Sequence, residues 1–273
     1  MEMITAILTA LLVVAAVGVI AGILLVLASH FFKVEEDEKV VKVRACLPGA
    51  NCGACGFAGC DSYAEAVAKG AAEANLCIPG GAAVVSELSG VLGVELSSAE
   101  EKVAFVFCNG DCNSVRYDVV YDGIESCKAS KLIYGGPSAC KFGCIGCGDC
   151  AAVCPADAIC IHDSLAHVNP DKCIGCGKCV KTCPNKVIDM VPKKSKVVVM
   201  CSNPEKGAVA RKKCKNVCFG CKKCEKTCPS HAITVTNNLA RIDYDKCSGC
   251  RECFDACVTK CIKAVDFYEG TIS

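Results

Sequence analysis

The chain has 273 residues, which is room for two or three small domains, and its formal net charge is only +1. Cysteine is abundant, with 29 residues, whereas Trp is absent and aromatic residues make up 5% of the chain. This composition argues against a fold held together by one large apolar core. The small net charge does not by itself predict a charged partner.

The segment from Ile4 to Ala28 contains no charged residue. As an α-helix it would extend about 37 Å, enough to cross a hydrocarbon core of roughly 30 Å. We predict a transmembrane helix rather than a cleaved signal peptide, because no basic segment precedes the apolar run. Four basic residues follow it, namely Lys33, Lys39, Lys42 and Arg44. The positive-inside rule then predicts a single-pass protein of the cell inner membrane with the bulk of the chain on the cytoplasmic side.

A glycine-rich cysteine motif follows, LPGANCGACGFAGC at residues 47–60, and another cysteine lies in LCIPGG at 76–81. The motif supplies four thiolates across a loop and a helix that we expect at about 62–73. Such a set suits a [4Fe–4S] cluster, with the ligands Cys52, Cys55, Cys60 and Cys77. Cys46 lies outside the set and is expected to be a small buried hydrophobe.

Residues 81–139 are the least informative part of the sequence. An apolar helix is expected over 84–94 and a strand over 102–107. Four cysteines follow: Cys108, Cys112, Cys127 and Cys140. Two interpretations stay open, because these four either bind a sixth cluster or are buried structural thiols. Cys127 and Cys140 recur 74 residues later as Cys201 and Cys214, to which we assign no ligand role.

Between residues 144 and 184 the pattern C-x₂-C-x₂-C-x₃-C-P occurs twice. This spacing is typical of bacterial ferredoxins with two [4Fe–4S] clusters, in which the fourth cysteine of each run binds the other cluster. The predicted sets are Cys144, Cys147, Cys150 and Cys183 for one cluster and Cys173, Cys176, Cys179 and Cys154 for its neighbour. Zinc also takes four thiolates, but zinc sites usually combine two separate C-x₂-C knuckles. The thiols are therefore expected to be reduced, metal-bound and cytoplasmic, not paired in disulfides.

The two cysteine runs together form one ferredoxin cassette. This cassette recurs at an offset of 74 residues. The sets predicted for the second copy are Cys218, Cys221, Cys224 and Cys257, and Cys247, Cys250, Cys253 and Cys228. Two-residue turns at 163–164 and 237–238 are expected to close a short hairpin in each copy. Cys160 and Cys261 stand alone and are expected to pack against the cassettes. Because units this small bury little surface, cluster binding should contribute to their folding free energy.

An apolar helix, the segment LPGANCGACGFAGC with the returning cysteine in LCIPGG, and C-terminal ferredoxin cassettes together resemble the B subunit of the Rnf complex. That family is a membrane ferredoxin:NAD⁺ oxidoreductase which couples electron flow to Na⁺ or H⁺ translocation. The resemblance covers essentially the whole chain and implies an electron relay that accepts electrons from reduced ferredoxin and passes them to other membrane subunits. It implies an NAD⁺ site on another subunit, and this chain indeed lacks a Gly-x-Gly-x₂-Gly motif.

Two other functions are kept as alternatives. One is the electron-transfer subunit of a membrane hydrogenase or formate-oxidising complex, against which the N-terminal cysteine motif argues. The other is a membrane-tethered zinc scaffold without electron transfer. No side chain is predicted to be catalytic.

From Lys193 to Lys226 the sequence contains eleven basic residues and only two acidic ones, Glu205 and Glu225. A basic surface beside clusters would attract an acidic electron carrier, so we predict that ferredoxin docks near Lys212, Lys213 and Lys215. An ordinary solvated lysine surface is the alternative. Nucleic acid is not an expected partner, because no aromatic stacking platform accompanies the charge.

We predict an α+β fold made of a single N-terminal transmembrane helix, a small [4Fe–4S] domain and two tandem bacterial-ferredoxin-like 2[4Fe–4S] domains. The expected divisions are an anchor at 1–30, the N-terminal cluster domain at 31–92, a connecting region at 93–140, the first ferredoxin-like domain at 141–192, a basic linker at 193–216 and the second ferredoxin-like domain at 217–273.

Overall fold

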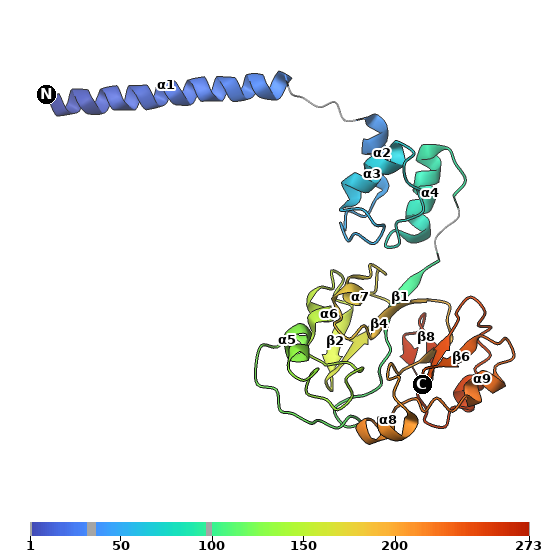
Figure 1. Ribbon diagram of the computed structural model, residues 1–273. Coiled ribbons are helices and arrows are strands. Elements are labelled where there is room, and N and C mark those ends of the chain that lie inside the picture. The colour runs from blue at the N-terminus through green and yellow to red at the C-terminus, as the bar shows by residue number, and fades with distance from the viewer. Residues whose placement is uncertain (1, 32–36, 97–99, 273) are drawn as a thin grey trace. The chain divides into compact units, whose positions relative to one another are not determined.

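The computed structural model describes residues 2–31, 37–96 and 100–272, and the chain divides into two units, residues 1–41 and 42–273 (Figure 1). The first unit contains the helix α1 (Glu2–Phe31), whose described side chains are apolar and exposed between Leu11 and Leu27. Over the described residues, no helix has the combination of length and apolar character that crossing a bilayer needs. Several side chains of the predicted span from Ile4 to Ala28, and also Lys33, lie outside the described residues.

The cysteine motif of residues 47–60 lies among three short helices. These are α2 (Glu38–Cys46), α3 (Cys60–Ala68) and α4 (Gly81–Leu92). The helix expected at 62–73 is present but ends earlier, at Ala68, just before Gly70 with its positive φ of 69°. The helix expected at 84–94 ends at Leu92, because Gly93 adopts the left-handed conformation as its C-cap. One side chain from each helix, Val43, Tyr63 and Leu88, is fully buried in the small core of this region.

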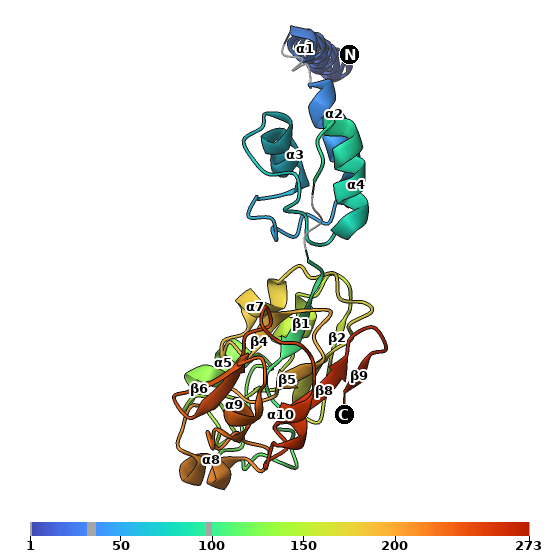
Figure 2. The same ribbon diagram turned by 90° about the vertical axis from the view of Figure 1, so that its right-hand side faces the viewer.

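Two ferredoxin-like units follow (Figure 2). The first contains β1 (Lys102–Val106), β2 (Ile159–His162), β3 (Leu165–Val168) and β4 (Ile188–Pro192), with helices α5 (Cys127–Leu132), α6 (Asp149–Ala152) and α7 (Lys178–Thr182). The second contains β5 (Val197–Val199), β6 (Ile233–Thr236), β7 (Leu239–Ile242), β8 (Ile262–Asp266) and β9 (Thr271–Ile272), with α8 (Gly207–Lys213), α9 (Lys223–Thr227) and α10 (Glu252–Asp255). Besides a hairpin, the first has a two-stranded sheet and the second a three-stranded sheet in the order β5-β8-β9. Both predicted hairpins are confirmed, as β2–β3 and β6–β7.

The strand that precedes each cassette belongs to the same fold as the cassette. Strand β1 pairs with β4 and strand β5 pairs with β8, both antiparallel, so β5 forms part of a sheet within the segment expected to be a basic linker. The two pairs pack on each other through a shared apolar cluster that includes Phe105, Val191, Val198 and Phe267. The rings of Phe105 and Phe267 meet edge to face at 5.9 Å. The two ferredoxin-like units are therefore held against each other by a common core.

The strand pairing shows which cysteines before the two cassettes correspond to each other, and it differs from the match made by sequence spacing. Val106 pairs with Ile188 and Val199 pairs with Ile262, so the cassettes repeat after 74 residues but the preceding strands repeat after 93. The counterpart of Cys201 is therefore Cys108, and the match of Cys127 to Cys201 was wrong. The cause is that the first unit has 19 more residues between its strand and its cassette.

Each hairpin turn lies directly against a glycine of a cysteine loop. Gly146 has a φ of +88°, and a Cβ atom there would lie 2.4 Å from the carbonyl oxygen of Ser164. Its equivalent Gly220 has a φ of +63°, and a Cβ there would lie 2.6 Å from Cα of Asn238. Glycine is required at both positions because the obstruction is backbone and cannot rotate away.

We expect Gly146→Ala to destabilise the first cassette far more than Gly177→Ala. Gly177 also has a positive φ, +69°, but nothing lies within 4 Å of its Cβ position. In Gly177→Ala the free energy of unfolding should fall by only about 1 kcal/mol, because alanine disfavours a positive φ. In Gly146→Ala the hairpin must also shift. The measurement is the rate at which the visible absorbance of the holoprotein bleaches on warming. Equal rates for the two variants would contradict the steric argument.

Candidate iron–sulfur centres

The first group of thiols in the first cassette brings together cysteines from both runs. Cys144, Cys150 and Cys183 line one cavity, and Cys150 lies in the first turn of α6 while Cys183 ends α7. Burial, with contributions from the nearby thiols of Cys144, Cys127 and Cys183, raises the pKa of Cys150 to about 12. The fold therefore places the fourth cysteine of the second run beside the loop of the first run.

The second group shows the reciprocal arrangement. Burial raises the pKa of Cys179 to about 11, with contributions from the thiols of Cys173, Cys176 and Cys154. The Sγ of Cys154 accepts a hydrogen bond from the backbone N–H of Ala158 at 3.3 Å, and the Sγ of Cys173 accepts one from Ala104 at 3.4 Å. Peptide N–H groups directed at sulfur suit thiolate ligands and help to set the potential of a bound cluster.

The second cassette repeats both groups. Burial raises the pKa of Cys224 to about 11, and its thiol neighbours are Cys218, Cys257 and Cys221. Burial likewise raises the pKa of Cys253 to about 12, and its thiol neighbours are Cys247, Cys228, Cys250 and Cys224. Each group of neighbours thus contains the cysteine that the crossed pattern assigns from the other run.

Two of the isolated cysteines can now be placed. Cys261 is buried with its sulfur 3.7 Å from that of Cys257, and it occupies the position of the buried Val187 in the first cassette. The hydrogen bond between the two thiols lowers the pKa of Cys257 to about 5. Cys160 is exposed on β2, so it does not pack against a cassette as expected.

The N-terminal motif gathers its four thiols around the loop before α3. Burial raises the pKa of Cys77, and the thiols of Cys60, Cys52 and Cys55 contribute to the rise. The hydroxyl of Tyr63 fixes the returning segment, since it donates to the carbonyl of Glu73 at 2.8 Å and accepts from the N–H of Leu76 at 3.1 Å. Cys46 instead donates to the carbonyl of Lys42 at 3.3 Å, and it is half-buried.

The structure does not bring together the four cysteines considered for a sixth cluster. Cys112 is exposed, and Cys127 lies beside Cys147, whose pKa is raised to about 11 by burial and by that neighbour. Cys108 and Cys140 line a different pocket, together with Cys201 and Cys214. Cys201 and Cys214 could not be recognised as partners from local spacing, because only strand register shows that Cys201 corresponds to Cys108.

The thiol groups fit iron–sulfur clusters better than single metal ions. Among the residues that the structure describes, no three His, Cys, Asp or Glu side chains converge as the ligands of one ion would. The cysteines of a [4Fe–4S] cluster are spread around a larger object, because each binds a different iron atom. Where burial raises the pKa of a thiol, as at Cys150, Cys179 and Cys224, binding of the positively charged iron would release its proton.

Two ferredoxin-like units with crossed thiol groups define the class of the protein: it is an iron–sulfur protein that binds [4Fe–4S] clusters. Three sequence families agree, an Fe-S cluster family over residues 47–79, a 4Fe-4S binding domain over 166–189 and a 4Fe-4S dicluster domain over 217–261.

Relatives extend this class to the whole chain. The B subunit of the Na⁺-translocating ferredoxin:NAD⁺ oxidoreductase complex of Acetobacterium woodii is 44% identical over 98% of this chain and 81% of its own length. The B subunit of the proton-translocating complex of Clostridium ljungdahlii is 45% identical over 93% and 91%. The B subunit of an ion-translocating oxidoreductase complex of Methanosarcina acetivorans is 38% identical over 92% and 96%. The chain belongs to this family of B subunits, the Rnf family that its motifs resemble.

Cys183 and Cys127 both lie beside Cys150, so either could bind the same cluster as Cys150. The crossed pattern assigns Cys183, and this assignment can be tested. We expect Cys183→Ala to lose about four iron atoms per chain, the content of one [4Fe–4S] cluster. Cys127→Ala should keep the iron content of the parent protein. Iron and acid-labile sulfide are measured on anaerobically purified protein, and loss in Cys127→Ala alone would reverse the assignment.

Proposed function

We propose that this chain is the electron-relay subunit of a membrane complex that oxidises reduced ferredoxin, reduces NAD⁺ on another subunit and translocates Na⁺ or H⁺. The main support is the grouping of thiols in each cassette, in which three cysteines of one run lie with the fourth cysteine of the other run. Cys150 has Cys179 of the other group as a neighbour, and Cys253 has Cys224, so the two groups of each cassette lie close together. When bound, [4Fe–4S] clusters supply one-electron transfer. The names of the relatives favour this function over a hydrogenase or formate-oxidising partner.

The residues of the chain hold and shield these centres. We assign five clusters to the twenty cysteines of the N-terminal motif and the two cassettes. Strand residues such as Leu165, Ile188, Leu239 and Ile262 are buried against the thiols and keep water away from them. Low solvent access and N–H groups directed at sulfur are the two means by which the protein sets their potentials.

The second cassette is the better place for ferredoxin to deliver an electron. Cys221 and Cys250 are exposed, whereas the corresponding Cys147 and Cys176 of the first cassette are half-buried. Cys221 is followed by the exposed residues 222–223, both lysines. An acidic carrier would therefore find positive charge beside an exposed cysteine of the second cassette.

The three lysines predicted to dock ferredoxin differ in what they can do. Lys212 and Lys215 are exposed, and the side chain of Lys215 donates to the carbonyl of Asn113 at 3.3 Å. Lys213 is less exposed and forms an ion pair with Glu205 at 2.5 Å. Docking is therefore assigned to Lys212 and Lys215, and Lys213 is left as a structural residue.

We expect the double variant Lys212→Glu/Lys215→Glu to slow reduction of the chain by reduced ferredoxin at least tenfold at low salt, because it reverses the local field. The control Lys172→Glu/Lys181→Glu makes the same charge change on exposed residues of the first cassette. Stopped-flow bleaching gives the second-order rate constant for each protein. The difference should shrink in 0.5 M salt, where the Debye length is only a few ångströms, about 4. Equal slowing in both variants would contradict docking at Lys212 and Lys215. An unmodified chain that ferredoxin does not reduce would overturn the proposed function.

The membrane attachment of the complex suggests a role for α1. The uncharged run from Ile4 to Ala28 and the exposed apolar side chains from Leu11 to Leu27 support an anchor that inserts in the bilayer. The basic residues after it support a cytoplasmic location for the cluster domains.

Removal of residues 2–31 tests this anchor. The shortened chain should appear in the soluble fraction with the iron content of the full chain, because all the cysteines lie after residue 31. The full chain should stay with the membranes after a carbonate wash. A shortened chain that still sediments with washed membranes would show that α1 is not the attachment.

A further inference from the structure

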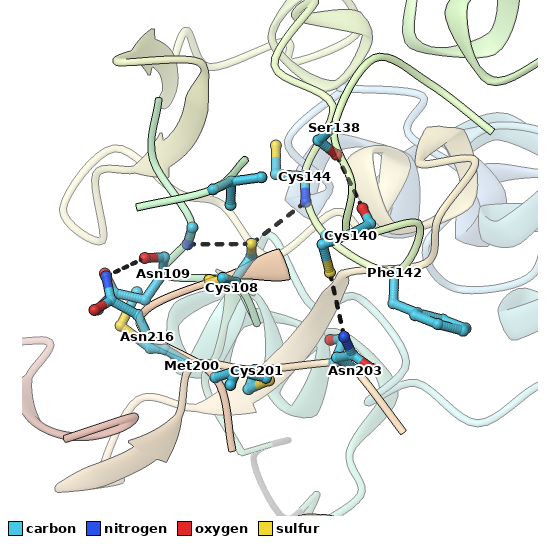
Figure 3. Close-up of a pocket in the computed structure, with 16 residues that line it drawn as sticks. Cys108, Asn109, Ser138, Cys140, Phe142, Cys144, Met200, Cys201, Asn203 and Asn216 are labelled. Atoms are coloured by element: carbon cyan, nitrogen blue, oxygen red, sulfur yellow. Dashed lines mark hydrogen bonds between the residues drawn. The ribbon is translucent and has the colours of Figure 1, made fainter. Parts of the chain in front are cut away.

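A second kind of thiol group lies where the two ferredoxin-like units meet (Figure 3). The pocket there is lined by residues of both units, among them Met200, Asn203 and Asn216. Four of its lining residues are buried cysteines, two from each unit: Cys108, Cys140, Cys201 and Cys214. None of them belongs to the C-x₂-C-x₂-C runs, so the five assigned clusters leave all four unused.

The four thiols are related by the internal duplication. Cys108 and Cys201 follow the equivalent strands β1 and β5 at the offset of 93 residues, whereas Cys140 and Cys214 precede the equivalent loops at the offset of 74. The surroundings repeat as well, because the N–H of Cys144 donates to the Sγ of Cys108 and the N–H of Cys218 donates to the Sγ of Cys201, both at 3.4 Å. The pocket is thus made by two copies of one cysteine pair.

The sulfur atoms lie at distances that a cluster would bridge. A Cβ atom at Gly110 would lie 3.6 Å from the sulfur of Cys108 and 3.4 Å from that of Cys214. The separation of the two sulfurs therefore cannot exceed the sum of these two distances. The sulfurs of Cys108 and Cys140 are similarly 3.4 Å and 3.6 Å from the Cβ position at Gly143. Cys140 is also a thiol neighbour of both Cys201 and Cys214. Side chains at these two glycines would fill the space between the sulfurs.

Each sulfur also receives an N–H donor. Cys108 accepts a second hydrogen bond, from the backbone of Gly110 at 3.4 Å, and Cys214 accepts one from the backbone of Asn216. Cys140 accepts from the side-chain amide of Asn203 at 3.6 Å. A neutral thiol is a weak acceptor, whereas a metal-bound thiolate accepts strongly. Four buried sulfurs that all face donors are therefore better explained by ligation than by apolar packing.

We propose that Cys108, Cys140, Cys201 and Cys214 bind a further [4Fe–4S] cluster that connects the two cassettes. Each thiol loses its proton as its sulfur binds one iron atom. The connecting role rests on the proposed function, because the electron comes from reduced ferredoxin and moves singly, without making or breaking a covalent bond. The hydrogen bonds from Cys144 and Cys218 link this site directly to a ligand-bearing loop in each cassette.

Two matched double variants distinguish this ligand set from the one suggested by sequence order. Cys201→Ser/Cys214→Ser should lower iron from about 24 to about 20 atoms per chain, with an equal loss of sulfide. Cys112→Ser/Cys127→Ser removes the same number of thiols and should keep about 24. Loss in the second variant alone, or in neither, would overturn the proposal. So would one zinc per chain that disappears in the first variant.

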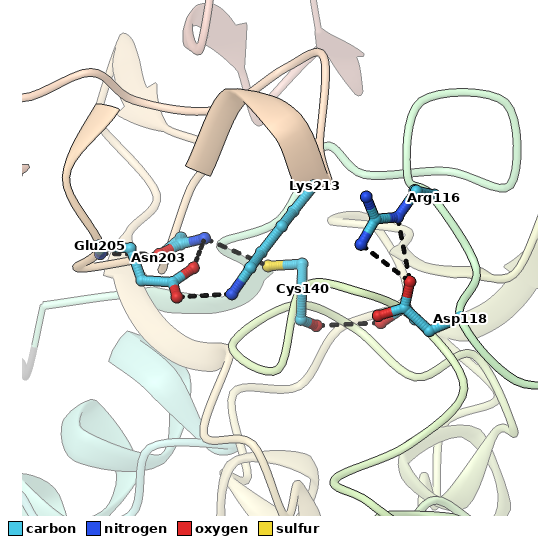
Figure 4. A network of polar contacts seen from close by, with 7 residues as sticks. Arg116, Asp118, Cys140, Asn203, Glu205 and Lys213 are labelled. Carbon is cyan, nitrogen blue, oxygen red and sulfur yellow. Dashed lines mark hydrogen bonds and ion pairs between the residues drawn. The ribbon is translucent and has the colours of Figure 1, made fainter. Parts of the chain in front are cut away.

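Asn203 gives a test that keeps all four cysteines. Its amide donates to Cys140 and to Glu205 at 3.1 Å, and its carbonyl oxygen accepts from the N–H of Glu205 at 2.8 Å (Figure 4). In Asn203→Ala the iron content should be unchanged, but one centre should shift to a lower midpoint potential, because the donor that stabilises its reduced form is gone. Redox titration followed by electron paramagnetic resonance measures this shift. Unchanged potentials of every centre would overturn the proposal even if the cysteine variants fail to fold.

Failure of the connecting role can be told apart from failure of binding. If the chain holds about 24 iron atoms but ferredoxin does not reduce it, the proposed cluster site is supported and the proposed function is contradicted. A chain with about 20 iron atoms that ferredoxin reduces rapidly would do the reverse.

Discussion

Burial of thiols is the constraint on which the rest of this structure depends. Residues such as Cys108, Cys150 and Cys253 have pKa values raised to about 12 by burial, so their ionised forms are disfavoured in the free protein. Bound iron supplies the positive charge that offsets this cost. The described strands are only two to five residues long, and residues of several of them pack against cysteines, so cluster binding and folding should be one coupled process.

The duplication explains how one short chain can organise several centres. Each cassette closes its first cysteine loop with a glycine that lies under a hairpin turn, Gly146 under Ser164 and Gly220 under Asn238. Both turns have two residues with positive φ, which suits a tight connection between twisted strands. Because the two units share the apolar cluster of β1, β4, β5 and β8, their cysteine loops are fixed relative to each other. A rigid spacing of this kind is what electron transfer between centres requires.

Local patterns predicted the parts of the fold that are local in sequence. The C-x₂-C-x₂-C-x₃-C runs, the hairpins at 163–164 and 237–238 and the strand that became β1 all follow from spacing and alternation within a few residues. The pocket between the units could not be predicted in this way. Its geometry depends on the pairing of β1 with β4 and of β5 with β8, across many residues, and the longer first connection made Cys127 the false counterpart of Cys201. Charge counting likewise could not show that Lys213 is paired.

That pairing gives Lys213 a different significance from its neighbours. Burial opposes ionisation of Glu205, but the hydrogen bonds from Lys213 and Asn203 outweigh it and lower the pKa of the carboxyl. The resulting chain of contacts runs from Lys213 through Glu205 and Asn203 to the sulfur of Cys140 (Figure 4). The carboxylate orients the amide, and Lys213 balances its negative charge close to a site where thiolates would gather. The basic segment therefore has two physical roles, with exposed lysines that can attract a carrier and one paired lysine that supports the hydrogen bonding of a buried thiol.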